Sequence, residues 1–468
     1  MLAIVFILSG CVSTTGISHD QTLREPIALG AKTKFDAWPS EQWWKNMQDP
    51  TLNQLIELAV KDNPDVVQAS KRLDKAKAYT DYVHSALSPE VTANANVIRQ
   101  RLSENAFYPP PYGGSYQSIA NASLNATWDL DFWGKNRSEL QAALSKTLAA
   151  EAEQATAKML IATSVAQTYY QLARQIEQQK IANQTLKQRE QELKLIKTRL
   201  DTGLDTNIEV EQGQGNIQSA RIELLAVTES VNLTRNALSA LTLQEPHALD
   251  SLNPLLPELE ARTLPEDVPI DLISRRPDLV AARAIVDSTS ADIKSVKADF
   301  YPNVSLSAFI GLSSFGLSRF LELGSGVIGA GPALHLPVFD GGRLRANLQL
   351  KNADFDIAIA RYNSVLLQAI HDVADQITSV QSVRHAFKDQ QDAVNASKSA
   401  YELARIRHEV GLTNYLTVLY AGDILLRERS RMVNLQARAL ELNISLIKSL
   451  GGGYIKQVVS SAQLNTIN

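Results

Sequence analysis

The chain has 468 residues, a formal net charge of −4 and a single cysteine. This charge does not favour a nucleic-acid-binding protein, and one cysteine excludes both an intrachain disulfide and a CxxC metal or redox site. The length is ample for a large core and would ordinarily suggest about three domains.

The N-terminus carries a short apolar run, Leu2 to Leu8, followed by Ser9, Gly10 and Cys11. The run is too short to span a membrane, which takes about 20 helical residues, but it has the length of the apolar core of a secretory signal. The sequence Leu8-Ser9-Gly10-Cys11 resembles the lipobox of bacterial lipoproteins. This resemblance implies a signal peptide over 1–10, lipidation of Cys11, and a lipidated N-terminal segment over 11–50.

Two runs, 135–202 and 343–410, contain neither glycine nor proline. Because these residues are the main helix breakers, each run predicts one long helix, which at 1.5 Å per residue would reach about 100 Å. Apolar residues recur at spacings of three and four, as in coiled coils. A glycine follows each run, and we expect the chain to return as helices over about 208–245 and 414–450.

The sequence contains a long internal repeat. Arg199, Gly203 and Leu204 recur 208 residues later as Arg407, Gly411 and Leu412. We predict a first repeat over 51–245, a proline-rich linker over 246–270, a second repeat over 271–453 and a tail over 454–468. Each repeat begins with a helix, over about 51–85 and 271–298.

Four segments alternate strictly between apolar and polar residues, which is typical of strands with two different faces. We predict strands at about 88–100, 117–133, 302–313 and 327–339. No apolar stretch of membrane-spanning length follows Cys11, so any crossing would use strands. Strands in a membrane must close into a barrel of at least about eight, so several chains would have to share one barrel.

Several segments together resemble the TolC/OprM-like outer membrane factor family, the exit ducts of tripartite efflux pumps, in its lipoprotein (NodT-type) branch. They cover nearly the whole chain and include WDLDFWGKNR (128–137), RRPDLVAAR (275–283), PVFDGGRLRA (337–346) and GLTNYLTVL (411–419). The resemblance implies a mixed α and β fold with an internal duplication. It also implies a homotrimer with a shared 12-stranded transmembrane β-barrel, four strands per chain, continued by a coiled-coil α-helical periplasmic barrel.

The same resemblance implies partners and a location. The partners are a periplasmic adaptor, an inner-membrane transporter of the RND type and outer-membrane lipid, and the location is the outer membrane of a Gram-negative bacterium with a large periplasmic part. The duct would pass small molecules from the transporter to the exterior.

The resemblance also implies functional residues, at the positions of this sequence that match the family's motifs. The duct would close at the segment YLTVLYAGD, 415–423, with Leu416 at the apolar position of the gate and Tyr420 where relatives place an acidic residue. Asp423, one turn further on, is the alternative acidic gate residue. The two helix tips would receive the adaptor, through Arg199, Gly203 and Leu204 in the first repeat and Arg407, Gly411 and Leu412 in the second.

The sequence offers no strong enzymatic signal, and we expect no enzyme activity, cofactor, metal or nucleic acid. Gly324, Gly326 and Gly329 have dinucleotide-type spacing, but Pro332 and an alternating run follow where that fingerprint needs a helix. His371, Asp372 and Asp375 could suggest a metal site, but carboxylates on the polar face of a helix are commonplace.

Two alternatives remain open at the level of sequence. One is a non-conducting periplasmic coiled-coil lipoprotein, acting as a scaffold or adhesin, which would explain Cys11 and the long helices but not four alternating strands. The other is the outer-membrane duct of a type I protein secretion system.

Overall fold

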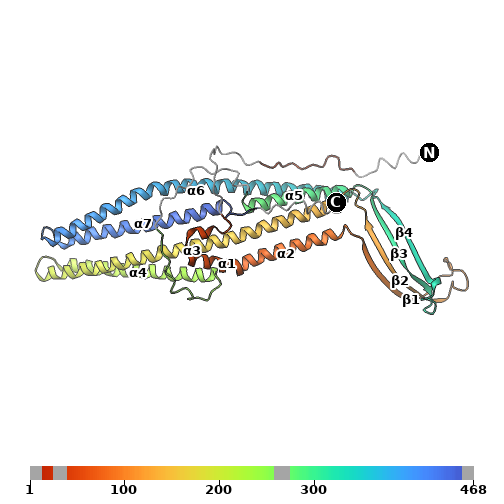
Figure 1. The fold of residues 1–468 in the computed structure, drawn as a ribbon, viewed down its shortest axis with the longest axis horizontal. Helices are drawn as coiled ribbons and strands as arrows, with labels where there is room; N and C mark the ends of the chain where they lie inside the picture. Colours follow the sequence, from red (N-terminus) through yellow and green to blue (C-terminus); the bar gives the residue numbers. More distant parts are fainter. Residues whose placement is uncertain (1–12, 25–39, 258–274, 456–468) are drawn as a thin grey trace. The chain divides into compact units, whose positions relative to one another are not determined.

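The computed structural model describes residues 13–24, 40–257 and 275–455. These residues fold as two compact units, the first from 13–24, 71–151 and 281–363 and the second from 40–70, 152–257, 275–280 and 364–455. Each unit takes segments from both halves of the chain, so the units do not coincide with the two repeats. The elements shown in Figure 1 are, in order, η2 (Trp43–Met47), α1 (Pro50–Asp62), α2 (Pro64–Ser85), β1 (Glu90–Arg101), β2 (Tyr116–Asp129), α3 (Lys135–Asp201), α4 (Asn207–Leu241), α5 (Pro277–Ala298), β3 (Asn303–Phe315), η4 (Leu323–Ser325), β4 (Gly326–His335), α6 (Arg343–Glu409) and α7 (Tyr415–Ser449).

The four strands form one antiparallel sheet in the order β1-β2-β3-β4 (Figure 1). The register aligns apolar residues across the whole sheet, as in the row Ala93, Leu124, Ile310 and Ile328. The next row, on the other face, runs through Thr92, Asn125, Phe309 and Gly329. The sheet therefore has one apolar face and one that is more polar, with many of its apolar side chains exposed in the single chain.

The fourth strand is shorter than the alternation predicts. It ends at His335 and not near 339, because Pro337 cannot donate to a ladder and restricts the residue before it. Pro332 lies inside β4, opposite Leu306. β3 is the one neighbour of β4 among the described residues, and the proline leaves this strand with one ladder donor fewer.

The long helices α3 and α6 are each 67 residues, and each is followed by a 35-residue helix, α4 or α7. The helix expected over 51–85 is instead two helices, α1 and α2, which meet at Asn63. Pro64 causes the break, since proline suits the first turn of a helix but not its interior. None of the helices in the described parts of the chain is both long enough and apolar enough to cross a membrane.

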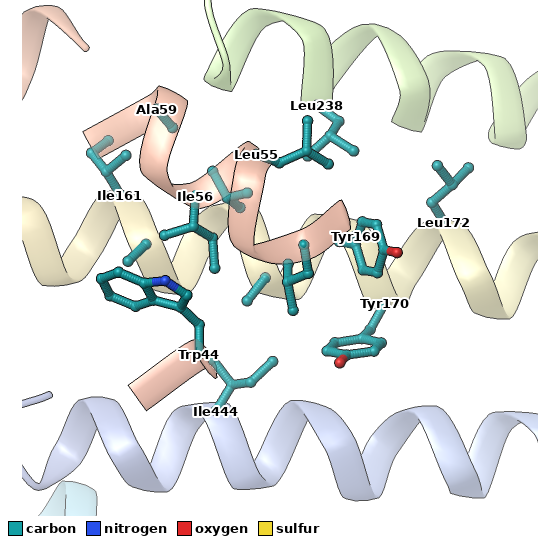
Figure 2. Close-up of a cluster of buried hydrophobic side chains, with 14 of the residues drawn as sticks. Trp44, Leu55, Ile56, Ala59, Ile161, Tyr169, Tyr170, Leu172, Leu238 and Ile444 are labelled. Atoms are coloured by element: carbon teal, nitrogen blue, oxygen red, sulfur yellow. The ribbon is translucent and has the colours of Figure 1, made fainter. Parts of the chain in front are cut away.

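A large core of the second unit gathers around α1 and the middle of α3 (Figure 2). Leu52 and Ile56 of α1 are fully buried, as are Leu172 of α3 and Ile444 of α7. Each fully buried side chain of this size contributes roughly 1.5–3 kcal/mol relative to its exposed state. The stripe of apolar residues on α3 is thus used to pack α1, α4 and α7 around one helix.

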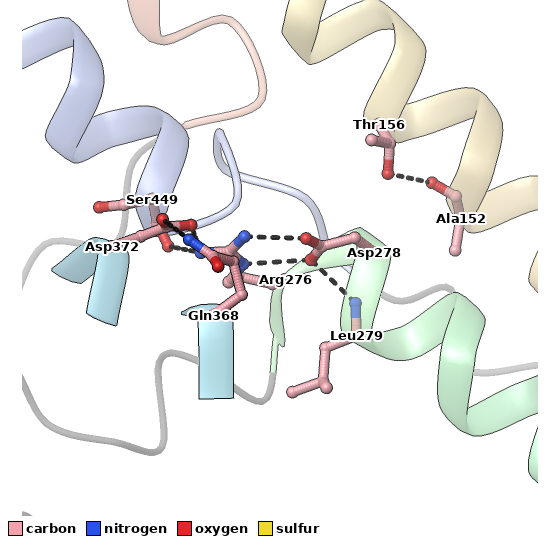
Figure 3. A network of polar contacts seen from close by, with 8 residues as sticks. All are labelled: Ala152, Thr156, Arg276, Asp278, Leu279, Gln368, Asp372 and Ser449. Carbon is pink, nitrogen blue, oxygen red and sulfur yellow. Dashed lines mark hydrogen bonds and ion pairs between the residues drawn. The ribbon is translucent and has the colours of Figure 1, made fainter. Parts of the chain in front are cut away.

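A single arginine joins three elements near the start of the second repeat (Figure 3). Arg276, just before α5, binds Asp278 through two hydrogen bonds of 2.8 and 3.1 Å. It also donates to Asp372 of α6 at 3.1 Å and to the backbone carbonyl of Ser449, at the end of α7, at 3.2 Å. Arg276 is 8% exposed and is paired with the carboxylates of Asp278 and Asp372, and a buried guanidinium requires such pairing.

Residues 13–24, which we call the strap, bind along the first turns of α6 in the first unit. Arg345 donates to the carbonyls of Ser13 and Thr15, and Asp356 accepts hydrogen bonds from the amides of Asp20 and Gln21. Asn363 bonds the strap in both directions, at 2.9 Å from the amide of Arg24 and 3.1 Å to the carbonyl of Thr22. Ile17 of the strap also packs on a small core of α5 and α6.

Candidate functional site: the helix tips and the gate segment

The turn after α3, residues 199–204, is the first tip. The amide of Gly203 donates to Leu200 O at 2.9 Å, and the amide of Leu204 donates to Arg199 O at 2.8 Å. Gly203 has φ +75°, and a Cβ added there would meet no atom within 4 Å, so the glycine is needed for its left-handed backbone and not for close packing within the chain. Leu204 is left 67% exposed.

The turn after α6, residues 407–413, is the second tip and has the same geometry. The amide of Gly411, at φ +76°, donates to His408 O at 2.9 Å, and that of Leu412 donates to Arg407 O at 2.8 Å. Leu412 is 69% exposed. Both tips therefore present an exposed leucine directly after a helix-ending glycine.

The two tips differ in their arginines. Arg199 forms a bidentate ion pair with Asp205, at 2.8 and 3.0 Å, which raises the pKa of Arg199. The residue equivalent to Asp205 in the second tip is Thr413, and Arg407 has no ion pair with any residue that the structure describes. The exposed guanidinium of Arg407 is therefore available to an outside partner, whereas that of Arg199 is already bound.

The gate segment, residues 415–423, forms the first turns of α7. Leu416 is half-buried, and Tyr420, one turn later on the same side, is 70% exposed. Asp423 lies one further turn along and forms an ion pair with Arg189 of α3. Burial opposes the charge of Arg189, but hydrogen bonds to Glu192 and Asp423 raise the pKa of Arg189 overall. The structure therefore leaves Tyr420 exposed and Leu416 partly exposed, and it ties Asp423 to the neighbouring helix.

Two residues of α3 that we did not predict, Gln188 and Arg189, hold the gate segment against this long helix. Gln188 donates a hydrogen bond from its side-chain amide to Leu419 O, beside the Arg189 pair. Gly422 lies where an added Cβ would come within 3.1 Å of Gln188 and 3.3 Å of Tyr401, so it allows α7 to approach both α3 and α6. No sequence signal links Arg189 to Asp423, because the two residues lie 234 positions apart.

Cys11 and the signal peptide over 1–10 lie outside the described residues. Lipidation of Cys11 therefore stays a prediction from the sequence.

A family model for outer membrane efflux proteins matches residues 55–242 and 268–452. The chain belongs to the outer membrane efflux protein family. The two matched segments correspond to the two halves of the internal duplication, which confirms the predicted fold class and the family resemblance. Members of this family are transport channels of the outer membrane, and the expectation of an outer-membrane efflux channel is confirmed in place of a non-conducting scaffold.

One relative and two solved structures illustrate the likeness. The multidrug resistance outer membrane protein MdtP of Escherichia coli strain K12 is 32% identical over 461 residues, covering 96% of this chain and 94% of MdtP. The crystal structure of the outer membrane protein VceC of Vibrio cholerae matches with a TM-score of 0.81 and 36% identity, over 89% of this chain and 100% of VceC. The Campylobacter jejuni CmeC outer membrane channel, at 21% identity, has the same fold, with a TM-score of 0.82 over 96% of this chain and 98% of CmeC.

Proposed function

We propose that this efflux protein acts as a homotrimer whose three sheets close one 12-stranded barrel in the outer membrane. The observation that carries this proposal is the open sheet. β1 and β4 each have one neighbouring strand among the described residues, so each has an unpaired edge. Since unpaired strand edges are not tolerated in hydrocarbon, β4 of one chain would pair with β1 of the next, in the antiparallel sense that the alternating order requires.

The face assignment supports this arrangement. The apolar rows run unbroken across all four strands, as a lipid-facing surface requires, and the opposite rows carry the polar side chains that suit a water-filled lumen. The long helices would line the periplasmic part of the duct, closed near Leu416 and Tyr420.

We further propose that this duct works with a periplasmic adaptor and an inner-membrane transporter, of which the RND type is the expected one. Relatives named for multidrug resistance favour small molecules as cargo over secreted proteins. The adaptor would bind at the exposed leucines of the two tips, Leu204 and Leu412. In this role the protein conducts solutes and performs no catalysis.

The experiment that tests the channel is single-channel conductance of the purified protein in planar bilayers. Wild type should give rare, small openings, and Leu416→Ala/Tyr420→Ala should give larger or longer ones. The matched control is Ile208→Ala/Gln212→Ala, which changes the equivalent positions of α4 in the first repeat.

Both outcomes are informative. If the control opens the channel as much as the gate variant does, the gate does not lie at Leu416 and Tyr420. If a preparation with about three times the 51.4 kDa chain mass conducts in no variant, the trimeric channel itself is wrong.

A further inference from the structure

A polar cleft of about 590 Å³ lies between α3 and α7 in the second unit, and no role described above uses it. Its volume falls within the range of small-molecule sites, which is roughly 300–1,000 Å³. Nearly all of its lining side chains are polar or charged, and the ones that matter here are Gln167, Gln171, Arg174, Asn434, Arg438 and Tyr170.

The cleft lies on the side of α3 that faces away from the hydrophobic core around α1. Ser164, Gln167, Gln171 and Arg174 follow one another at spacings of three and four and so share one helix face. The buried residues of the core, such as Val165, Tyr169 and Leu172, occupy the other face. A helix in the middle of a packed bundle thus presents amide and hydroxyl groups to a cavity large enough for a ligand.

The cleft carries one unbalanced positive charge. Arg438 is paired with Glu441 at 2.9 Å, so these two charges cancel. Arg174 has no acidic partner among the described residues, and its guanidinium reaches only the side-chain oxygen of Asn434, at 3.5 Å. A guanidinium presents a planar set of donors that suits a carboxylate bound through both oxygens.

Tyr170 adds a hydroxyl donor to the lining of the cleft. The residue is 4% exposed, its ring lies between α3 and α7 (Figure 2), and its hydroxyl makes no hydrogen bond to any described residue. Burial, helped by the nearby charge of Asp49, raises the pKa of Tyr170 to about 12, so the hydroxyl keeps its proton and can donate. Tyr170 lines the cleft, so a ligand held there can accept a hydrogen bond from its hydroxyl.

We propose that this cleft binds a small hydroxylated carboxylate, a molecule of the sugar-acid class. The carboxylate would pair with Arg174 and accept a hydrogen bond from Tyr170. The hydroxyl groups would exchange hydrogen bonds with the side-chain amides of Gln167, Gln171 and Asn434. The site is complete within one chain, so a trimer would hold three.

The test is isothermal titration calorimetry of the purified, detergent-solubilised protein with D-glucuronate, and with neutral methyl glucoside as the matched uncharged probe. Wild type should bind glucuronate with a Kd of about 10 mM or tighter, at one molecule per chain, and methyl glucoside at least tenfold more weakly. Arg174→Gln should weaken glucuronate binding at least tenfold, and Arg174→Lys should recover part of the loss. Tyr170→Phe, which keeps the packing of the ring, should weaken it by about fivefold.

The control is Arg431→Gln, which removes a surface arginine of α7 that is paired with Glu428 away from the cleft. It should bind glucuronate as wild type does. The proposal is overturned if wild type takes up no glucuronate, if Arg174→Gln binds it as wild type does, or if the neutral glycoside binds equally well. Conductance measured on the same preparations separates this result from the channel function, since a channel that conducts but binds no glucuronate contradicts the cleft alone.

Discussion

Tyr169 and Asp49 join α1 to the long helix α3. The hydroxyl of Tyr169 donates a hydrogen bond of 2.7 Å to Oδ2 of Asp49. The other oxygen of the same carboxylate accepts the amides of Thr51 and Leu52 at the start of α1, at 3.0 and 3.1 Å. One carboxylate therefore both caps α1 and fixes it to α3.

We expect Tyr169→Phe to lower the free energy of unfolding by about 1 kcal/mol, because the half-buried Asp49 loses a hydrogen bond. Asp49→Ala should cost about 1 kcal/mol more, since it also removes the cap of α1. Asp49→Asn keeps a good capping residue and should lie between them. Thermal unfolding followed by circular dichroism in detergent measures all three. Equal stability of Tyr169→Phe and wild type would show that the bond contributes nothing.

The buried tyrosine Tyr170 predicts a response to alkali. Burial raises its pKa to about 12, above the ordinary value of about 10. Its contribution to stability is therefore complete below pH 10 and is lost as the pH rises from about 10 to 12, because the unfolded chain ionises first. When the melting temperature is measured against pH, that of Tyr170→Phe should fall less steeply over this range than that of wild type. Parallel curves for the two proteins would contradict the shift.

The ion pair between Arg189 and Asp423 should hold the gate segment closed. The two side chains are 25% and 18% exposed, so their pairing contributes about 1 kcal/mol, which corresponds to about a fivefold change in the ratio of open to closed states. Arg189→Ala should raise the open probability in planar bilayers by about that factor. Arg221→Ala, which breaks an exposed pair with Glu190, is the control and should leave it unchanged.

The free arginine of the second tip predicts an asymmetry between the repeats. Arg407→Ala should raise the Kd for the adaptor by about fivefold or more, because it removes a direct contact at the interface. Arg199→Ala should act mainly on the stability of the first tip. Binding of a purified adaptor, measured by surface plasmon resonance, tests both, with Arg405→Ala on the same helix as the control. Equal losses at Arg199 and Arg407 would refute the asymmetry.

The strap should be released by changes on α6 alone. Arg345→Ala/Asn363→Ala removes four hydrogen bonds to residues 13–24. At about 1 kcal/mol for each bond, trypsin cleavage after Arg24 should accelerate at least tenfold. Lys351→Ala, which breaks an ion pair with Asp354 on the same helix, should be cut at the wild-type rate. A strap that is cut equally fast in all three proteins would not be held by these contacts.

Much of this architecture could be read from the sequence because local chemistry determines it. The glycine- and proline-free runs predict α3 and α6 to within a residue at their ends, and Gly203 and Gly411 mark the turns that follow. Alternation predicts the strands, but it cannot locate where a proline ends β4. Pairs such as Arg189 with Asp423 lie beyond prediction, since they depend on how distant helices are placed side by side.

The hydrogen bonds of Arg276 to α5, α6 and α7 have a consequence for the order of folding. Its acceptor at Ser449 follows 173 residues later in the chain. At about 5–20 residues per second, the ribosome would need roughly 10–35 s to produce that partner after Arg276 itself is made. During this interval Arg276 can bind Asp278 but not the end of α7. The bond that joins α7 to the start of the second repeat can therefore form only when synthesis is nearly over.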